Sequence, residues 1–153
     1  MADFLDTLAQ SAKATISSGY YEAITETATA DVSLKKAILE TKNAPVITEI
    51  KAASPSAGTI RENVEARSIA ESMEKGGAVG ISILTEPKHF NGSLRSLVEA
   101  RRAVKLPILM KDIILSPAQL DTASKLGANV ALLIKALCAY SLNHGRQLNF
   151  QFL

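Results

Sequence analysis

The chain has 153 residues, of which 47% are apolar, 21% are charged and 5% are aromatic. This length allows one globular domain with a substantial core and is too short for two ordinary domains. The 17 Lys and Arg residues exceed the 15 Asp and Glu residues by only two, and the charges are interspersed, which argues against a dedicated nucleic-acid or membrane-surface binder. We therefore expect a small-molecule or protein partner.

The N-terminal sequence, the lengths of the apolar stretches and the cysteine content predict where in the cell the protein is located. No stretch approaches the roughly 18 consecutive apolar residues of a membrane-spanning helix. The N-terminus carries Asp3 and Asp6 early and lacks the basic start and apolar run of a signal peptide. The single cysteine, Cys138, cannot form an internal disulfide. These features predict a soluble, cytoplasmic protein in a reducing compartment.

Residues 1–44 read as a helical N-terminal extension. Apolar residues recur at intervals of three and four from Phe4 to Ile16, which predicts a first helix, and Gly19 is expected to end this helix. A second helix is expected to begin near Ser33, with an apolar face opposite a charged one. Asn43 and Pro45 end this second helix.

From Pro45 to residue 135, short runs rich in β-branched residues alternate with helical periods. Because parallel neighbours need a long crossover, this order predicts βαβ units with about four parallel strands, an α/β fold. A closed (β/α)8 barrel of the TIM type needs about 200 residues, so 45–135 is expected to form a partial barrel. The expected strands are 46–51, 79–84, 108–112 and 130–134, and the expected helices are 63–75, 93–104 and 116–126.

The last segment, residues 136–153, has an atypical composition. It contains no acidic residue, and it has no clear helical or strand period. One interpretation is a frayed C-terminal tail. The other is a frameshifted or foreign ending after Lys135.

Charged residues interrupt two of the expected strands near their C-terminal ends, where parallel α/β proteins bind ligands. Glu49 and Lys51 share a face with Ile47 by the strand period of two, and Lys111 with Asp112 forms a second charged pair. The alternative is a solvated salt bridge at a strand end. Two lysines directed at one opening suit an anionic or carbonyl substrate, because a lysine ammonium can act as a general acid.

Two loops follow the first two expected strands. The loop from Ser54 to Gly58 offers hydroxyls and amides to a phosphate, although the same pattern also occurs in ordinary turns. The later loop carries His89 and Phe90, and Phe90 is either a lid that stacks on a ring or an anchor for the next helix. No metal site is expected, because His89 has no second ligand at a suitable spacing. No glycine-rich dinucleotide loop is present.

Four motifs follow one another along the chain: Val46-Ile47-Thr48-Glu49-Ile50-Lys51-Ala52-Ala53-Ser54-Pro55-Ser56, Gly80 to Glu86 with Phe90-Asn91-Gly92-Ser93, Leu106 to Asp112, and Gly127-Ala128 leading to Leu132-Leu133-Ile134. In their order and spacing they resemble the indole-3-glycerol-phosphate synthase family over about residues 1–135. The resemblance implies a TIM-barrel enzyme of tryptophan biosynthesis that uses no cofactor. Its phosphorylated small-molecule substrate, 1-(2-carboxyphenylamino)-1-deoxyribulose 5-phosphate, is cyclised with loss of carbon dioxide and water.

The resemblance also implies roles for individual residues. Lys111 matches the general acid that protonates the ribulose carbonyl oxygen. Lys51 matches the lysine that meets the substrate carboxylate and assists later acid chemistry, and Glu49 matches the glutamate that orients these amines and contacts substrate. The substrate-binding positions matched are Ser54 for phosphate and Phe90 and Leu132 for the apolar wall.

Three departures from the family pattern affect what is expected. Ile113 stands where the family usually has Phe, which loosens the expected aromatic pocket, and Ala57 replaces a frequent lysine. Beyond Ile134 the family continues through four more units that carry a further catalytic glutamate and the main phosphate site. The chain is therefore expected to be a truncated synthase, weakly active or inactive alone, or active with a separate C-terminal half-barrel chain. The alternative is a non-catalytic half-barrel that homodimerises and at most binds a phosphorylated small molecule.

Overall fold

The computed structural model describes residues 3–140 and 151–152, and its centre is a parallel sheet with the strand order β1-β4-β5-β6-β7. The expected parallel α/β fold is confirmed, and it corresponds to part of a TIM barrel. The sheet strands are β1 (Ile47–Ile50), β4 (Gly80–Leu84), β5 (Ile108–Lys111), β6 (Val130–Ala131) and β7 (Gln151–Phe152). The helices are α1 (Phe4–Ser17), α2 (Leu34–Glu40), α3 (Ala66–Lys75), α4 (Leu94–Ala103), α5 (Pro117–Lys125) and the 3-10 helix η1 (Lys135–Tyr140).

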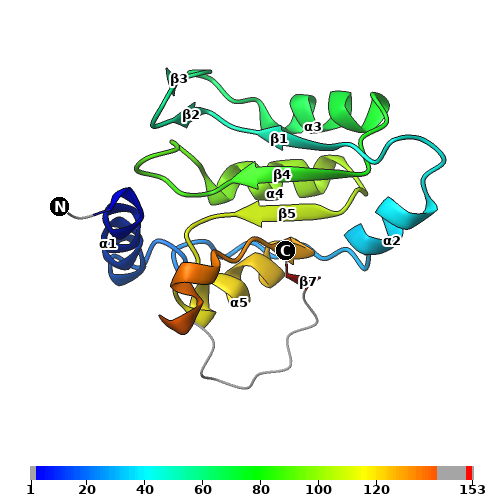
Figure 1. The fold of residues 1–153 in the computed structure, drawn as a ribbon. Helices are drawn as coiled ribbons and strands as arrows, with labels where there is room; N and C mark the ends of the chain where they lie inside the picture. Colours follow the sequence, from blue (N-terminus) through cyan, green and yellow to red (C-terminus); the bar gives the residue numbers. More distant parts are fainter. Residues whose placement is uncertain (1–2, 141–150, 153) are drawn as a thin grey trace.

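The helices surround the sheet in a way that defines a functional end. α3 and α4 pack against one face of the strands, while α1 lies at the end toward which the strand arrows point and α2 lies at the opposite end (Figure 1). Ligand sites of β/α barrels form at the carboxyl ends of the strands. The helix α1 therefore lies beside the end of the sheet where a ligand is expected.

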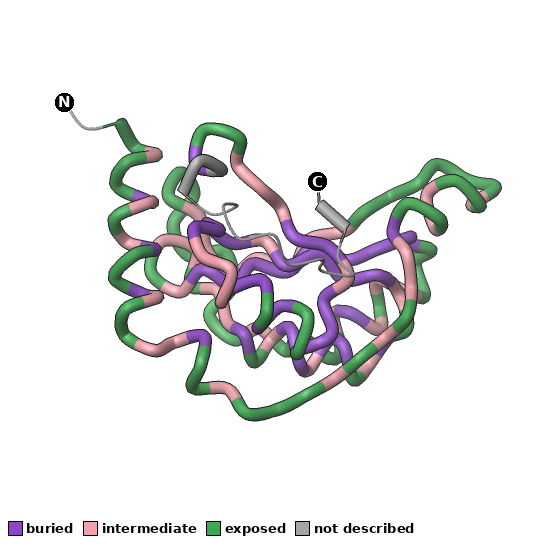
Figure 2. The backbone as a smooth tube through the Cα atoms, turned by 90° about the horizontal axis from the view of Figure 1, so that it is seen from below, coloured by how far each residue is buried: buried purple, intermediate pink, exposed green. Residues whose placement is uncertain are grey.

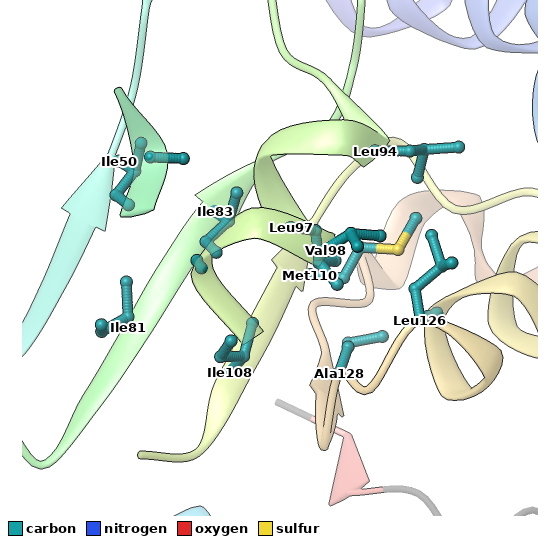
Figure 3. Close-up of a cluster of buried hydrophobic side chains, with 14 of the residues drawn as sticks. Ile50, Ile81, Ile83, Leu94, Leu97, Val98, Ile108, Met110, Leu126 and Ala128 are labelled. Atoms are coloured by element: carbon teal, nitrogen blue, oxygen red, sulfur yellow. The ribbon is translucent and has the colours of Figure 1, made fainter. Parts of the chain in front are cut away.

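The main apolar core lies between the sheet and the helices α3 and α4. Ile81 and Ile83 of β4 alternate with residues of the opposite face, and they meet Leu97 and Val98 of α4 (Figure 3). Buried backbone is concentrated in the central strands, whereas the outer side of α1 and several connections are exposed (Figure 2). Alternation along each strand thus separates a helix-covered face from a second face.

That second face carries a row of residues in register across four strands. Glu49 of β1 pairs with Ser82 of β4, which pairs with Leu109 of β5, which pairs with Val130 of β6. Leu34 of α2 packs on Leu109 and Val130 in a separate small cluster. In a closed barrel this face lines the interior.

The N-terminal extension consists of two helices joined by a long non-helical segment. Between α1 and α2 the chain follows α5 and the turn after it. The Thr122 hydroxyl donates to the Tyr21 carbonyl at 3.1 Å, and the Asn129 amide donates to the Ala30 carbonyl at 2.7 Å. These two hydrogen bonds connect the extension to α5 and to the residue that precedes β6.

Serines cap three helices at the positions where the sequence predicts that these helices begin. Ser33, Ser93 and Ser116 each accept a hydrogen bond from a backbone N–H in the first turn of the following helix. Gly127 ends α5 with a φ of 87°. The helix α3 begins at Ala66, three residues later than expected from the apolar period.

Three further regions of the chain differ from the sequence expectation. Strand β6 ends at Ala131 rather than at residue 134. The Ser54 loop forms a short antiparallel hairpin of β2 (Ala53–Ser54) and β3 (Gly58–Thr59). Within the segment interpreted as an atypical tail, Gln151 and Phe152 form β7, which pairs in parallel with β6. Two-residue strands carry too few side chains to produce a detectable period.

Candidate active site

Three of the expected site residues meet at the carboxyl end of the sheet. The Glu49 carboxylate lies between two lysines: its Oε2 accepts a hydrogen bond from Lys111 Nζ at 2.6 Å, and its Oε1 lies 3.3 Å from Lys51 Nζ. Strand β4 separates β1 from β5, and its residue in register with Glu49 is the small Ser82. The carboxylate and the two amines thus form one partly exposed cluster.

The electrostatics of this cluster favour charged groups. Partial burial on its own raises the pKa of Glu49, but the hydrogen bonds and positive charges of Lys111 and Lys51 outweigh burial and hold that pKa below its usual value. The carboxylate is therefore ionised near neutral pH. An ionised Glu49 between two amines can hold both of them in place for an incoming anion.

An apolar cavity of about 180 Å³ opens beside Lys111. Two of the expected wall residues, Phe90 and Leu132, line this cavity together with Lys111. Such a lining suits a planar apolar group with the amine at its edge. Glu49 and Lys51 do not line the cavity, but Glu49 contacts the Lys111 amine and Lys51 contacts Glu49. The remaining lining residues are Leu8, Leu84, Glu86, Asp112, Ile113 and Ile134.

The loop that carries Phe90 is held by a buried carboxylate. Glu86 accepts hydrogen bonds from the backbone N–H groups of Lys88 at 3.0 Å, His89 at 2.6 Å and Phe90 at 3.0 Å. The carbonyl of Phe90 in turn accepts from the N–H of Ala53 in the hairpin. Phe90 is half-buried and packs beside Leu8, so this ring is both anchored in its loop and exposed to the cavity.

Lys111 and Asp112 both lie at the C-terminal end of β5, as expected, but their side chains have different partners. Consecutive residues of a strand point to opposite faces, and Asp112 is buried where Tyr21 and Thr85 donate hydrogen bonds to its carboxylate. The partner of Lys111 is instead Glu49, which lies 62 positions earlier in the chain. Burial raises the pKa of Asp112 to about 6, against the effect of these hydrogen bonds.

The remaining expected site residue, Ser54, lies apart from the cavity lining. Its hydroxyl accepts a hydrogen bond from the N–H of Ala57 at 3.2 Å and lies 3.4 Å from the Ser56 hydroxyl. These contacts stabilise the turn of the β2–β3 hairpin. Both serines remain close enough together to offer hydroxyls to one anion.

The structure adds residues that the sequence patterns did not single out. Leu8 lines the cavity from α1, and Glu86 holds the Phe90 loop. In the sequence, Glu86 is recognisable only as an acidic residue two positions after a buried strand, and Leu8 only as part of the apolar period of α1.

Among the described residues no group of three His, Cys, Asp or Glu side chains has the arrangement of a metal site. No helix in the described part of the chain has the length and hydropathy to cross a membrane.

Comparison with known proteins gives a family match over most of the chain. Residues 5–148 match the family model described as indole-3-glycerol phosphate synthase, which extends beyond Lys135, where the motif resemblance stops. Curated relatives named indole-3-glycerol phosphate synthase include that of Methanocaldococcus jannaschii, 56% identical over 104 residues, which are 67% of this chain and 38% of the relative. That of Carboxydothermus hydrogenoformans is 46% identical over 112 residues, 71% of this chain and 42% of the relative.

The matched segments are short compared with the relatives themselves. A third relative, from Koribacter versatilis, is 47% identical over 91 residues, which are 60% of this chain and 35% of the relative. The chain therefore spans about two fifths or less of the length of these curated relatives. Its family assignment rests on the model match over residues 5–148 and on identities near one half. The chain belongs to the indole-3-glycerol phosphate synthase family.

Proposed function

We propose that this chain supplies the proton-donating part of an indole-3-glycerol phosphate synthase active site, a carbon-carbon lyase of tryptophan biosynthesis. The observation that carries the proposal is the Lys111 amine, held 2.6 Å from Glu49 and lining an apolar cavity. A cavity beside an amine suits the aryl group of the substrate, with its carbonyl next to the amine. The family match supports the same reaction.

The reaction needs a proton at a defined atom. The ring carbon that carries the carboxylate attacks the ribulose carbonyl carbon, while the carbonyl oxygen takes a proton from the Lys111 ammonium. Carbon dioxide then leaves, and its bonding electrons return to the ring. Loss of the new hydroxyl as water, with a proton from the neighbouring methylene carbon, completes the indole. A general acid placed at the carbonyl contributes about 10² to 10⁴ in rate.

The other candidate residues take roles that match their positions. Lys51 meets the substrate carboxylate and assists the later acid step, and Glu49 orients both amines through its two oxygens. Phe90 and Leu132 form walls for the aryl ring. Ser54 binds the phosphate through the turn hydroxyls of the hairpin. No cofactor is required, because the steps transfer protons and rearrange bonding electrons without net oxidation or reduction.

We propose a C-terminal half-barrel as the partner that completes the site. The relatives extend well beyond their matched segments, and the sheet face carrying Glu49 is the one that lines the interior of a closed barrel. Strand β1 pairs only with β4 among the described residues. A complementary set of strands added at this edge would cover that face and enclose the cavity.

Activity measurements test the proposal directly. The chain is assayed for indole formation from the substrate, alone and mixed with the part of the Methanocaldococcus jannaschii relative that follows its matched segment. We expect turnover in the mixture, and we expect Lys111→Ala to lower kcat by about 10² or more because the general acid is lost. Lys75→Ala, at an exposed lysine ending α3, is the matched control.

Two results would contradict the proposal. Equal turnover of Lys111→Ala and wild type shows that Lys111 is not the acid. Turnover by the chain alone at the rate of a full-length relative removes the need for a second half. A stable homodimer without turnover in either condition supports the alternative function, a non-catalytic half-barrel that at most binds a phosphorylated small molecule.

A further inference from the structure

A buried polar network surrounds the main chain next to Lys111. Asp112 follows Lys111 directly, and its carboxylate oxygen Oδ2 accepts hydrogen bonds from Thr85 Oγ1 at 2.6 Å and from the Tyr21 hydroxyl at 3.1 Å. The other oxygen, Oδ1, accepts from the Ile113 N–H at 2.8 Å. Three donors from three parts of the chain thus converge on one buried carboxylate.

Gln119 of α5 completes this network. Its amide nitrogen donates to the Tyr21 hydroxyl at 3.0 Å and to the Ile113 carbonyl at 3.0 Å. The Tyr21 phenol is therefore a donor to Asp112 and an acceptor from Gln119. The members of the network are all at most 3% exposed, so water does not readily replace a lost hydroxyl: Tyr21, Thr85, Asp112 and Gln119.

The same network holds the backbone of Lys111. The N–H of Thr85 donates to the Lys111 carbonyl at 3.0 Å, while the Thr85 hydroxyl holds the next residue, Asp112. Thr85 thereby holds both the Lys111 carbonyl and the side chain of the residue that follows it. Once this backbone is held, the position of Lys111 Nζ depends only on side-chain torsions and on its bond to Glu49.

We propose that Tyr21 is a positioning residue for Lys111, and that its hydroxyl acts through the Asp112 carboxylate to hold the end of β5. For its effect on turnover this inference rests on the proposed function. A buried charged network costs more free energy of folding than apolar packing of similar volume. A polar network in which every group is hydrogen-bonded, however, favours a single geometry. Through Tyr21, the N-terminal extension contributes to proton donation by Lys111.

Amine labelling in the intact chain tests this inference without substrate. Acylation of each lysine is measured by peptide mass spectrometry across a pH series, in wild type and in Tyr21→Phe. We expect Tyr21→Phe to raise the labelling rate of Lys111 several-fold relative to that of exposed Lys75, because the amine leaves its bond to Glu49. Tyr20→Phe is the matched control, since the Tyr20 hydroxyl bonds to the main chain of Thr85 and Leu94 and not to Asp112.

The outcomes separate positioning from general destabilisation. An unchanged Lys111 rate in Tyr21→Phe overturns the inference, and so does a rise shared equally by all lysines. If Tyr21→Phe does not fold, Thr85→Val removes the other hydroxyl on Oδ2 with little change of shape and carries the same expectation. Where turnover is obtained, we expect Tyr21→Phe to lower kcat with little change in KM. A Lys111 labelling effect without any turnover contradicts only the proposed function.

Discussion

At the scale of single residues, the pKa values of Glu49 and Asp112 are shifted in opposite directions. Glu49 faces two lysines, and their charges outweigh its partial burial and lower its pKa. Asp112 faces hydroxyls and an amide rather than a cation, so its burial dominates and raises its pKa to about 6. The negative charge of Glu86 adds to this rise. The pKa of each carboxylate is therefore lowered or raised according to whether a cationic group lies within contact distance.

Asp112 makes stability depend on pH with a defined sign. Its pKa is raised in the folded state, so the folded chain binds the proton more tightly than the unfolded chain. Its contribution to stability is present at low pH and is lost as the pH rises from 3.8 to about 6, a loss on the order of 3 kcal/mol. Urea unfolding at a series of pH values measures the free energy of unfolding in wild type and in Asp112→Asn.

The variant Asp112→Asn cannot ionise, so we expect its free energy of unfolding to fall less than that of wild type between pH 4 and 6. Glu49 is unchanged in both chains, and its own contribution, lost as the pH falls below its usual pKa range, cancels in the comparison. Parallel stability curves for the two chains would show that Asp112 does not titrate in this window.

At the scale of elements, two helices end at glycines with nearly the same backbone conformation. Gly77 follows α3 with a φ of 88°, and Gly127 follows α5 with a φ of 87°. The space around them differs. A Cβ at Gly77 would meet nothing within 4 Å, whereas at Gly127 it would lie 2.7 Å from Arg101 Cδ and 2.8 Å from the Ala28 carbonyl oxygen. The end of α5 is therefore also the packing surface for the extension.

Alanine at these two glycines separates backbone strain from steric clash. We expect Gly77→Ala to cost about 1 to 2 kcal/mol, the usual penalty of a left-handed conformation. Gly127→Ala is expected to cost more, because the Ala28 backbone must also move. Urea unfolding of both variants gives the difference. Equal losses of stability in the two variants would mean that the extension adapts to the methyl group without cost.

At the scale of the whole molecule, one edge of the sheet combines an unpaired strand with exposed apolar side chains. Strand β1 has no second partner among the described residues, and Val46 and Ile47 beside this edge are 52% and 39% exposed. An unpaired, apolar strand edge is a template for association. The same edge is where the proposed C-terminal half would bind.

We expect the chain by itself to associate as its concentration rises, and Val46→Lys to weaken this association because a charge at a strand edge opposes pairing. Phe4→Lys is the matched control, since Phe4 has the same exposed fraction of 52% but lies in α1, which is beside the carboxyl ends of the strands and is not part of the β1 edge (Figure 1). Sedimentation velocity over a concentration series measures the effect. A chain that stays monomeric at every concentration, or two variants with equal association, would contradict the expectation.

Local patterns were sufficient to determine much of this protein. The strand period places Glu49 and Lys51 on one face, serine caps mark the starts of three helices, and the alternation of strands and helices predicts a parallel sheet. These features depend on residues a few positions apart, whose relation is set by backbone geometry alone.

Only the tertiary structure decided which distant groups meet. Lys111 reaches Glu49 across β4, and Asp112 turns away to Tyr21, 91 positions earlier in the chain. Sequence neighbours on a strand point to opposite faces, so adjacency of Lys111 and Asp112 carries no information about their partners. The order of strands and the path of the extension determine those partners, because burial leaves each carboxylate only the donors that the fold brings within reach.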